Sequence, residues 1–550
     1  MSNGKIMHEI TSEIVPAIDF KGIRCIKDYS EICQDYSPYL CDESKLAHKG
    51  AQYLFFPTNE GELSAIFKEM SKRNITVTLS GARTGLVGGA VPYGGAIVSL
   101  ERFDKILGLR YDSHSKEWLV KAECGVTIRD LNNWAMKKTF PGLLEGGSAE
   151  TKAFLEKYKE TKTIYFYPPD PTEMGAALGG TVSTNASGAR TYRYGATRNW
   201  VRWIRVMLAS GEVLEIPRGK YFATPAGEFI IIDSKQNETA VKIPSYSMPL
   251  TKNAAGIFSA PNMDLIDLFI GSEGIFGAIT EVEVALQKWN NPISIVQFLP
   301  SDDKAIDFVI RLRREKSIRP EFIEFYSSHS LDLLRKKQKE DPKVVGMPPI
   351  PDYATSAVFF DLQFNPENKD YDYSRLEEIA YRCGSTLAMS WAGYEQRDLE
   401  RFKNFRHVLP ETVNTIIAER KKKIAELYKL GTDLAVPDHA LEEIWAFYRS
   451  TLENAGLEWV AFGHIGNNHI HINIIPRSLK EMKEGLSIYR EFARKAVDLG
   501  GTISAEHGVG KIKKEFFSIM FSDKALKEMK AVKIALDPGL MLNPGNMLDM

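Results

Sequence analysis

Residues 80–90 read SGARTGLVGGA, and their four glycines follow directly on the apolar stretch ITVTL at 75–79. Glycine allows backbone N–H groups to approach a phosphate closely, although a single loop of this kind is equally compatible with a surface turn. The chain repeats the chemistry in ALGGTVSTNASGAR at 177–190 and in GSEGIFGAIT at 271–280. Three such loops predict a cradle for the pyrophosphate of a large dinucleotide. Lysines are few in them, so binding would rest on backbone amides.

The composition is that of an ordinary soluble protein. A chain of 550 residues is too long for one core, so we expect two or three domains. The formal net charge of −1 gives no basic field for nucleic acid. Five cysteines without a CxxC pair favour free thiols in a reducing compartment and argue against an iron–sulfur cluster in this chain.

The N-terminus lacks the pattern of a signal peptide, and no apolar stretch reaches the ~18 residues of a membrane span. We therefore expect a cytoplasmic protein, and leave open peripheral contact with the inner face of the membrane. Strand-like and helix-like stretches alternate, with Asn59 as a predicted helix N-cap. Residues 147–163 read as a charged helical insertion and residues 217–250 as a loop-rich one. Together these patterns predict an α+β protein.

Taken together with PPDPTEMGAALGGTVSTNASG (168–188) and KNAAGIF (252–258), the glycine-rich loops resemble the vanillyl-alcohol-oxidase (VAO) type of FAD-binding domain. The closer resemblance is to its D-2-hydroxy-acid dehydrogenase branch, which includes D-lactate dehydrogenases, D-2-hydroxyglutarate dehydrogenases and the flavin subunit of glycolate oxidase. GHIGNNHIH (463–471), EHGVG (506–510) and LDPGLMLNPGNML (536–548) extend this resemblance over roughly residues 45–548.

The resemblance implies a fold with four parts. These are an N-terminal segment (1–45), a two-subdomain PCMH-type FAD-binding domain (46–288), an α+β cap with an antiparallel sheet (289–525) and a C-terminal segment that returns to the FAD domain (526–550). It also implies which residues line the FAD site: Ser80, Gly81, Ala82, Arg83, Thr84, Gly85, Gly88 and Gly89 at the pyrophosphate; Pro169, Asp170, Gly179, Gly180, Thr181, Asn185, Ser187 and Gly188 opposite them; Glu273, Gly274 and Ile279 near the adenosine; and Asn543 in the tail.

Arg83 departs from the small residue that is common in the family, and either pairs with a phosphate or points to solvent. Relatives that attach FAD covalently use a histidine or cysteine in or near these loops. The first loop contains neither, so we expect non-covalent FAD, with Cys124 as a buried strand thiol.

The segment FGHIGNNHIHINI (462–474) holds three of the ten histidines. On a regular strand His464 and His471, seven positions apart, would face opposite ways, so they converge only if the chain bends at Gly466–Asn468. His469 and His471 share a face without a bend. Either pair could hold a divalent ion, and a polar strand pair without metal is the alternative. Glu506 would complete a set of two histidines and one carboxylate.

The family motif reads roughly His-x-Gly-Asp-Gly-Asn-x-His, with a later Glu-His-Gly. Matched by position, it implies that His464, His471 and Glu506 bind the metal (zinc, iron or manganese) and that His507 is the catalytic base. Asn467, Asn468 and His469 stand where the family commonly has Asp, Gly and Asn. Because the family Asn touches the substrate, His469 either changes substrate choice or adds a fourth ligand.

The resemblance further implies that Arg406 clamps the substrate carboxylate, which suits a planar guanidinium. Lys429 lies about two positions along the chain from the place where the family has a substrate-binding lysine. The metal would lower the pKa of the substrate hydroxyl, His507 would take the proton, and the Cα hydride would pass to the flavin N5. D-Lactate is the first substrate expected.

Electrons would leave to a separate acceptor: an electron-transfer flavoprotein, a quinone or an iron–sulfur protein. A homodimer is compatible with the sequence. Two alternatives stay open: an oxidase of another alcohol class that oxygen reoxidises, and an inactive flavin-binding subunit of a larger complex.

Overall fold

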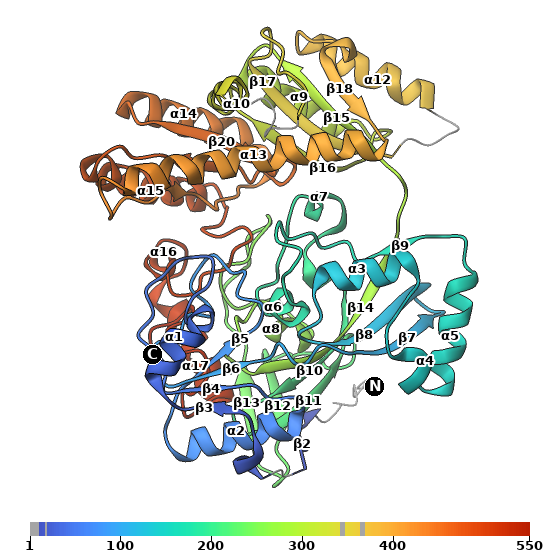
Figure 1. Cartoon of the computed structure of the whole chain (residues 1–550), viewed down its shortest axis with the longest axis vertical. Helices are drawn as coiled ribbons and strands as arrows, with labels where there is room; N and C mark the ends of the chain where they lie inside the picture. The colour runs from blue at the N-terminus through green and yellow to red at the C-terminus, as the bar shows by residue number, and fades with distance from the viewer. Residues whose placement is uncertain (1–9, 17–18, 341–346, 364–368) are drawn as a thin grey trace.

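The computed structural model of the chain describes residues 10–16, 19–340, 347–363 and 369–550. Residues 1–9 and 17–18 of the predicted N-terminal segment therefore lie outside it. Figure 1 shows a base domain, made of residues 10–288 and 504–550, below a cap domain, residues 293–503. Among the described helices, none is long and apolar enough to cross a membrane.

The first sheet of the base domain carries the glycine-rich loop that follows β5. Its strands, in spatial order, are β3 (Cys25–Ile26), β4 (Tyr53–Phe55), β6 (Ala96–Ser99) and β5 (Val77–Ser80). Helix α2 (Glu60–Lys72) begins at Asn59, whose side chain accepts a hydrogen bond from the Glu62 amide at 3.0 Å, which confirms the predicted N-cap. Strands β4, β6 and β5 are parallel, so the loop after β5 leaves from the carboxyl edge, where ligands of such sheets bind.

The second sheet of the base domain carries the third glycine-rich segment, which runs directly into its central strand β14. This sheet consists, in spatial order, of β2 (Glu13–Ile14), β11 (Glu212–Pro217), β10 (Val201–Met207), β14 (Ala278–Lys288), β8 (Glu117–Glu123) and β7 (Ile106–Asp112), with β9 (Tyr165–Phe166) also pairing with β14. Strand β14 is buried along most of its length because it has neighbours on both edges and is covered on both faces.

One of the two predicted insertions forms regular structure that the sequence did not predict. Residues 217–250, predicted to be loop-rich, contain a hairpin of β12 (Glu228–Ile232) and β13 (Glu238–Lys242), joined at its edge by β1 (Ile10–Thr11). Phe229 and Ile231 are buried at alternating positions of β12, and Val241 is buried opposite Phe229, which is the pattern of a strand pair with one face on a core. The predicted charged helix is α5 (Ala149–Glu160). The other helices of this domain are α1 (Tyr29–Asp35), α3 (Ile128–Lys137), α4 (Leu143–Gly146), α6 (Leu178–Ser183), α7 (Thr191–Tyr194) and α8 (Ile266–Phe269).

The cap domain is one antiparallel sheet with helices packed on it, as predicted. Its strands, in spatial order, are β18 (Ser390–Gly393), β15 (Ile293–Leu299), β17 (Ser356–Leu362), β16 (Pro320–Tyr326), β20 (Trp459–Gly463), β21 (His471–Ile474) and β19 (Leu430–Gly431). Its helices are α9 (Asp302–Arg314), α10 (Ser328–Glu340), α12 (Lys369–Arg382), α13 (Gln396–Lys421), α14 (Leu441–Ala455) and α15 (Leu479–Asp498).

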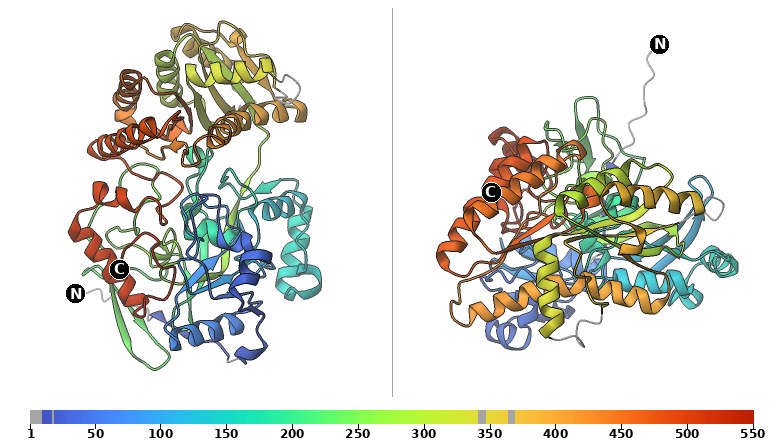
Figure 2. Two further views of the ribbon diagram at one scale, coloured as in Figure 1. Left: turned by 60° about the vertical axis from the view of Figure 1, so that its left-hand side comes forward. Right: turned by 90° about the horizontal axis from the view of Figure 1, so that it is seen from above.

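The end of the chain returns to the base domain earlier than the predicted boundary at residue 525. Helices α16 (Lys514–Met520) and α17 (Asp523–Leu536) lie beside the base domain in Figure 1 and in the left view of Figure 2. Phe521 packs on Tyr246, with ring centroids 4.8 Å apart. Leu542 then bridges to Val77 of β5. The segment that carries Glu506 and His507 therefore passes between the two domains.

Candidate functional site

The histidine segment bends where the sequence allows it to bend. Strand β20 ends at Gly463, a short 3-10 turn covers Ile465–Asn467, and β21 returns antiparallel from His471. Asn468 has a φ of +53°, a left-handed conformation that asparagine tolerates better than other non-glycine residues. This explains how an asparagine stands where the family commonly has glycine. The bend brings the rings of His464 and His471 to 5.4 Å between centroids.

Glu506 lies at the centre of the imidazoles. Its Oε2 is 3.3 Å from Nε2 of His464, and its Oε1 is 3.4 Å from Nε2 of His471. Its Oε1 is also 3.4 Å from Nε2 of His507. The structure thus brings together the two predicted histidine ligands, the predicted carboxylate and the predicted base.

The outer ring nitrogens of the two histidines have acceptors of their own. Nδ1 of His464 is 2.7 Å from a carboxylate oxygen of Glu324, and Nδ1 of His471 is 3.0 Å from the carbonyl of Thr432. Because Nδ1 points outward to an acceptor, Nε2 is the ring nitrogen that faces Glu506, and in the neutral imidazole its lone pair would be available there to an ion, which is the usual orientation of metal-binding histidines. The donor atoms of His464, His469, His471 and Glu506 lie within 4.8 Å of one another, and the outward bonds of His464 and His471 make these two histidines, with Glu506, the set that fits a divalent ion.

His469 is fully buried and oriented differently. Its Nε2 is 3.0 Å from Asp433 Oδ1, while its Nδ1 is 3.5 Å from the Lys252 ammonium and 3.8 Å from Glu506. Because an ammonium only donates, Nδ1 of His469 must offer its lone pair to Lys252. Burial, followed by the charge of nearby His471, holds the pKa of His469 well below its ordinary value. These contacts favour a neutral supporting imidazole over a fourth ligand or a substrate contact.

Asp433, Glu506 and His507 form a second group with the composition of a metal site. The Asp433 carboxylate already accepts from Lys513 Nζ at 2.5 Å, Ser504 Oγ at 2.7 Å, and the backbone amides of Glu506 at 3.2 Å and His507 at 3.1 Å. An ion at Asp433 would have to compete with these donors for its two oxygens. The first group is the better candidate metal site.

Opposite charges keep the buried carboxylates of this cluster ionised. Burial alone would raise the pKa of Glu506, but Lys252, whose Nζ lies 2.6 Å away, and His464 outweigh it and hold that pKa well below its usual range. The pKa of Glu324 falls to about 2, since its attraction to His464 and Arg406 outweighs its burial. Conversely, Glu324 and Glu506 overcome burial and raise the pKa of His464 to about 9. Glu506 and Glu324 are therefore ionised at neutral pH, with Lys252, Arg406 and His464 as their positive partners in the metal-free protein.

Two predicted substrate contacts lie at different distances from this cluster. Arg406, on α13, has Nη2 3.4 Å from Glu324 Oε1 and leaves 24% of its side chain exposed, so it lies at the edge of the cluster with donors to spare. Lys429 directly precedes β19, whose Leu430 pairs with Ile474. This register places Lys429 near the end of β21 remote from His471, which does not support a substrate contact.

The predicted FAD glycines fall into two groups. A Cβ at Gly188 would stand 2.0 Å from the Asp170 carbonyl, and one at Gly179 would stand 2.5 Å from Cys124 Cβ, so the protein's own packing requires these glycines. At Gly81, Gly85, Gly89 and Gly180 a Cβ would meet nothing closer than 3.6 Å. Packing within the protein does not require glycine at these four positions. The open space beside their backbone amides fits the close approach of a dinucleotide.

Other predicted cofactor residues are engaged within the protein. Glu273 is buried, and its carboxylate accepts hydrogen bonds from the amides of Val509 at 2.6 Å and Gly510 at 2.8 Å. Asn543 accepts one from the Leu79 amide and donates one to the Glu273 carbonyl, both at 2.7 Å. These contacts tie the EHGVG segment and the tail to the glycine-rich loops. Arg83 does not point to solvent: its guanidinium lies over the Tyr39 ring, 4.3 Å from the centroid.

A cavity of about 300 Å³ joins the second glycine-rich segment to the cluster. It is lined at one end by Asn185, Ser187 and Gly271 and at the other by Lys252 and Ala505, next to Glu506. The Ser187 hydroxyl is buried without a hydrogen-bond partner in the described structure, as expected where a ligand supplies one. A flavin held by the glycine-rich segments could reach the histidines through this space.

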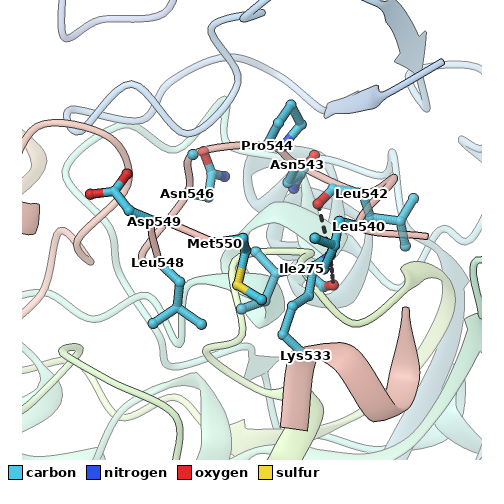
Figure 3. A pocket seen from close by; sticks show the side chains of 11 residues that line it. Ile275, Lys533, Leu540, Leu542, Asn543, Pro544, Asn546, Leu548, Asp549 and Met550 are labelled. Carbon is cyan, nitrogen blue, oxygen red and sulfur yellow. Dashed lines mark hydrogen bonds between the residues drawn. The ribbon is translucent and has the colours of Figure 1, made fainter. Parts of the chain in front are cut away.

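A second cavity, of about 170 Å³, lies under the tail and offers no comparable chemistry. Figure 3 shows its lining of Leu540, Leu542, Leu548 and Met550 around the Lys533 ammonium. That ammonium is already bound by the Ile275 carbonyl at 2.7 Å, the Leu542 carbonyl at 2.9 Å and Asp537 at 2.5 Å.

Sequence reasoning missed Glu324, Lys252 and Asp433 as parts of the site. Glu324 stands inside the apolar run PEFIEFY of β16, and a charged residue within such a run is a signal that could have been read. Lys252 belongs to the motif KNAAGIF, where its charge alone gave no indication of a role. Asp433 belongs to none of the motifs that the sequence analysis used. Cys124 is a buried free thiol, as predicted.

Residues 51–151 and 156–217 match the FAD binding domain family, and residues 291–547 match the family of FAD linked oxidases, C-terminal domain. The D-lactate dehydrogenase of Anaerostipes hadrus is 26% identical over 543 residues, which cover 94% of this chain and 93% of that protein. A probable mitochondrial D-2-hydroxyglutarate dehydrogenase of Oryza sativa subsp. japonica is 27% identical over 510 residues, with 91% and 76% covered.

The solved structure of an alkyldihydroxyacetonephosphate synthase superposes with a TM-score of 0.58 at 14% identity, covering 97% of this chain and 88% of that one. At this identity the likeness concerns the fold alone. Together with the FAD binding domain match, it confirms the predicted VAO-type base domain and its α+β cap.

Proposed function

We propose that this chain, which matches the FAD binding domain and the C-terminal domain of FAD linked oxidases, is a metal-dependent dehydrogenase that oxidises a D-2-hydroxy acid, D-lactate first, to the 2-oxo acid. The observation that carries the proposal is that Nε2 of His464 and Nε2 of His471 each lie within 3.4 Å of a carboxylate oxygen of Glu506. The names of the relatives support the substrate class.

In this proposal the metal ligands, the flavin loops, the arginine and the catalytic base each have a separate role. His464, His471 and Glu506 would hold the ion, and the glycine-rich segments would hold FAD. When bound, the ion lowers the pKa of the substrate hydroxyl and the flavin accepts the hydride. Arg406 pairs with the substrate carboxylate. His507 takes the hydroxyl proton through Nε2 as the Cα–H bond breaks with its electron pair, so one hydride and one proton leave each hydroxy acid.

The first test is anaerobic mixing of the holoprotein with D-lactate, with the metal content measured on the same sample. We expect the yellow flavin absorbance to bleach with D-lactate and not with L-lactate, and about one divalent ion per flavin in a two-histidine, one-carboxylate site. Admitting air then separates two functions, because slow recolouring indicates a dehydrogenase and fast recolouring an oxidase. Absence of bleaching by a panel of D-2-hydroxy acids would refute the proposal and favour an inactive flavin-binding subunit.

The electron acceptor is proposed to be a separate carrier: an electron-transfer flavoprotein, a quinone or an iron–sulfur protein. The five cysteines are free and scattered, which supports an acceptor outside this chain. Turnover of D-lactate with an artificial electron acceptor under anaerobic conditions tests this. Multiple turnovers without any added acceptor would contradict it.

A further inference from the structure

We infer that Asp433 is a positioning residue that acts through His507: its carboxylate holds Nδ1 of that imidazole so that Nε2 faces Glu506 and the incoming substrate. This inference rests on the proposed function, in which His507 takes the hydroxyl proton. It concerns a residue that the sequence motifs did not single out.

The contacts of His507 show how it is oriented. Its Nδ1 is 3.2 Å from Asp433 Oδ2, and its backbone amide donates to the same oxygen at 3.1 Å. The far side of the ring places Nε2 3.4 Å from Glu506 Oε1. His507 also leaves 27% of its side chain exposed, against 15% for His471 and 6% for His464. It is therefore the clustered imidazole that a substrate can reach most easily.

The Asp433 carboxylate is itself held rigidly. Its side chain is 1% exposed, and Lys513 Nζ at 2.5 Å supplies the opposite charge. The hydroxyl of Ser504 donates to the same oxygen at 2.7 Å. Held in this way, the Asp433 carboxylate presents Oδ2 to Nδ1 of His507 at 3.2 Å and is placed to accept from Nδ1–H.

The consequence for His507 is a choice of tautomer. A neutral imidazole carries its proton on one nitrogen. Of the two carboxylates that face the ring, Asp433 at Nδ1 is the closer, at 3.2 Å against 3.4 Å for Glu506 at Nε2, and the Glu506 oxygen is shared with His471, so the form with Nδ1–H is favoured. That form leaves a lone pair on Nε2, which a base requires. Asparagine at position 433 would keep the shape of the side chain but could present its NH₂ group to Nδ1. This would favour the opposite tautomer and leave Nε2 without its lone pair.

A double-mutant cycle tests whether Asp433 acts through His507. We expect Asp433→Asn to lower kcat for D-lactate by about 10- to 100-fold, the range reported for outer partners of functional histidines, with KM changed less than about threefold. In a His507→Ala background the same substitution should change kcat by less than about threefold, because the group it positions is gone. Flavin and metal contents should remain those of the wild type.

Asp537 offers a matched control. It is a second buried aspartate bound by a lysine, Lys533 at 2.5 Å, and by backbone amides, those of Met541 at 3.1 Å and Leu542 at 2.8 Å, but its carboxylate has no histidine partner in the described structure. We expect Asp537→Asn to lower the thermal midpoint without lowering kcat per bound flavin. If Asp433→Asn behaves in the same way, Asp433 is merely structural.

Other outcomes separate this inference from the proposed function. An equal loss from Asp433→Asn with and without His507 would overturn the inference while leaving the dehydrogenase intact. If no hydroxy acid reduces the flavin, ¹⁵N-histidine NMR still decides, with His507→Ala to assign the signal. We expect the Nδ1–H form in the wild type and its loss in Asp433→Asn. An unchanged tautomer refutes the inference.

Discussion

Replacing Glu324 by glutamine removes one charge from beneath the candidate metal site and changes little else in shape. In the wild type its carboxylate accepts from His464 Nδ1 at 2.7 Å and lies 3.4 Å from Arg406 Nη2, with 3% of the side chain exposed. The pKa of Glu324 falls from 4.5 to about 2. Since one pKa unit corresponds to ~1.4 kcal/mol, the ionised carboxylate stabilises the folded protein by roughly 3 kcal/mol at neutral pH.

The sign of this contribution fixes its pH window. A lowered carboxyl pKa gives stability that is present above 4.5 and is lost as the pH falls through about 2. The raised pKa of His464, about 9, describes the same attraction, so the two are not added, and the stabilisation is also lost as the pH rises through that value. In metal-free protein we therefore expect Glu324→Gln to lower the free energy of unfolding by roughly 3 kcal/mol at pH 7. The difference in the free energy of unfolding between wild type and Glu324→Gln should shrink as the pH falls from 4.5 towards 2, and again as it rises through about 9.

The same substitution should weaken metal binding. Loss of an outer carboxylate partner of a ligating histidine typically costs about 10- to 100-fold in affinity. Competition with a chelator, followed by metal analysis, measures this directly. Glu321 is the matched control: it lies on the same strand, is equally buried, and contacts Tyr194 and Arg190 instead of a histidine. If Glu324→Gln retains wild-type metal affinity, or if Glu321→Gln loses as much, His464 is not oriented by Glu324 for metal binding.

Three further predictions address the ligands, the flavin loops and the substrate clamp. His471→Ala and Glu506→Gln should each lose the ion and the bleaching by D-lactate, whereas the same assays on His114→Ala, an exposed histidine on the turn after β7, should match the wild type. Gly180→Ala should lower FAD affinity and leave the thermal midpoint of the apoprotein unchanged, because the added Cβ would meet no protein atom within 4 Å. Gly188→Ala should destabilise the apoprotein itself, because the added Cβ would stand 2.0 Å from the Asp170 carbonyl. Arg406→Lys should raise KM for D-lactate by about tenfold or more, since a lysine cannot form the paired hydrogen bonds of a guanidinium; an unchanged KM would place the substrate carboxylate elsewhere.

The sequence predicted those structural features that depend only on residues close together along the chain. The N-cap at Asn59, the charged helix at 149–160 and the bend at Gly466–Asn468 each depend on a few consecutive residues. The hairpin at 228–242 was missed because its two strands are short, five residues each, and its partners, α17 and β1, lie almost three hundred and more than two hundred residues away. The early return of the chain after residue 503 was missed for the same reason.

By itself the sequence determined the family, the glycine-rich loops and the set of imidazole and carboxylate groups able to bind a cation, since these follow from residue types in order. Only the tertiary structure decided which nitrogen of each histidine faces Glu506, because Glu324 on β16 and Thr432 and Asp433 directly after β19 reach those rings from distant parts of the chain. A strand side chain points to one of two faces of the sheet, and the local sequence does not specify which residues it contacts on that face. The sheet register and the packing of the cap against the base domain specify it.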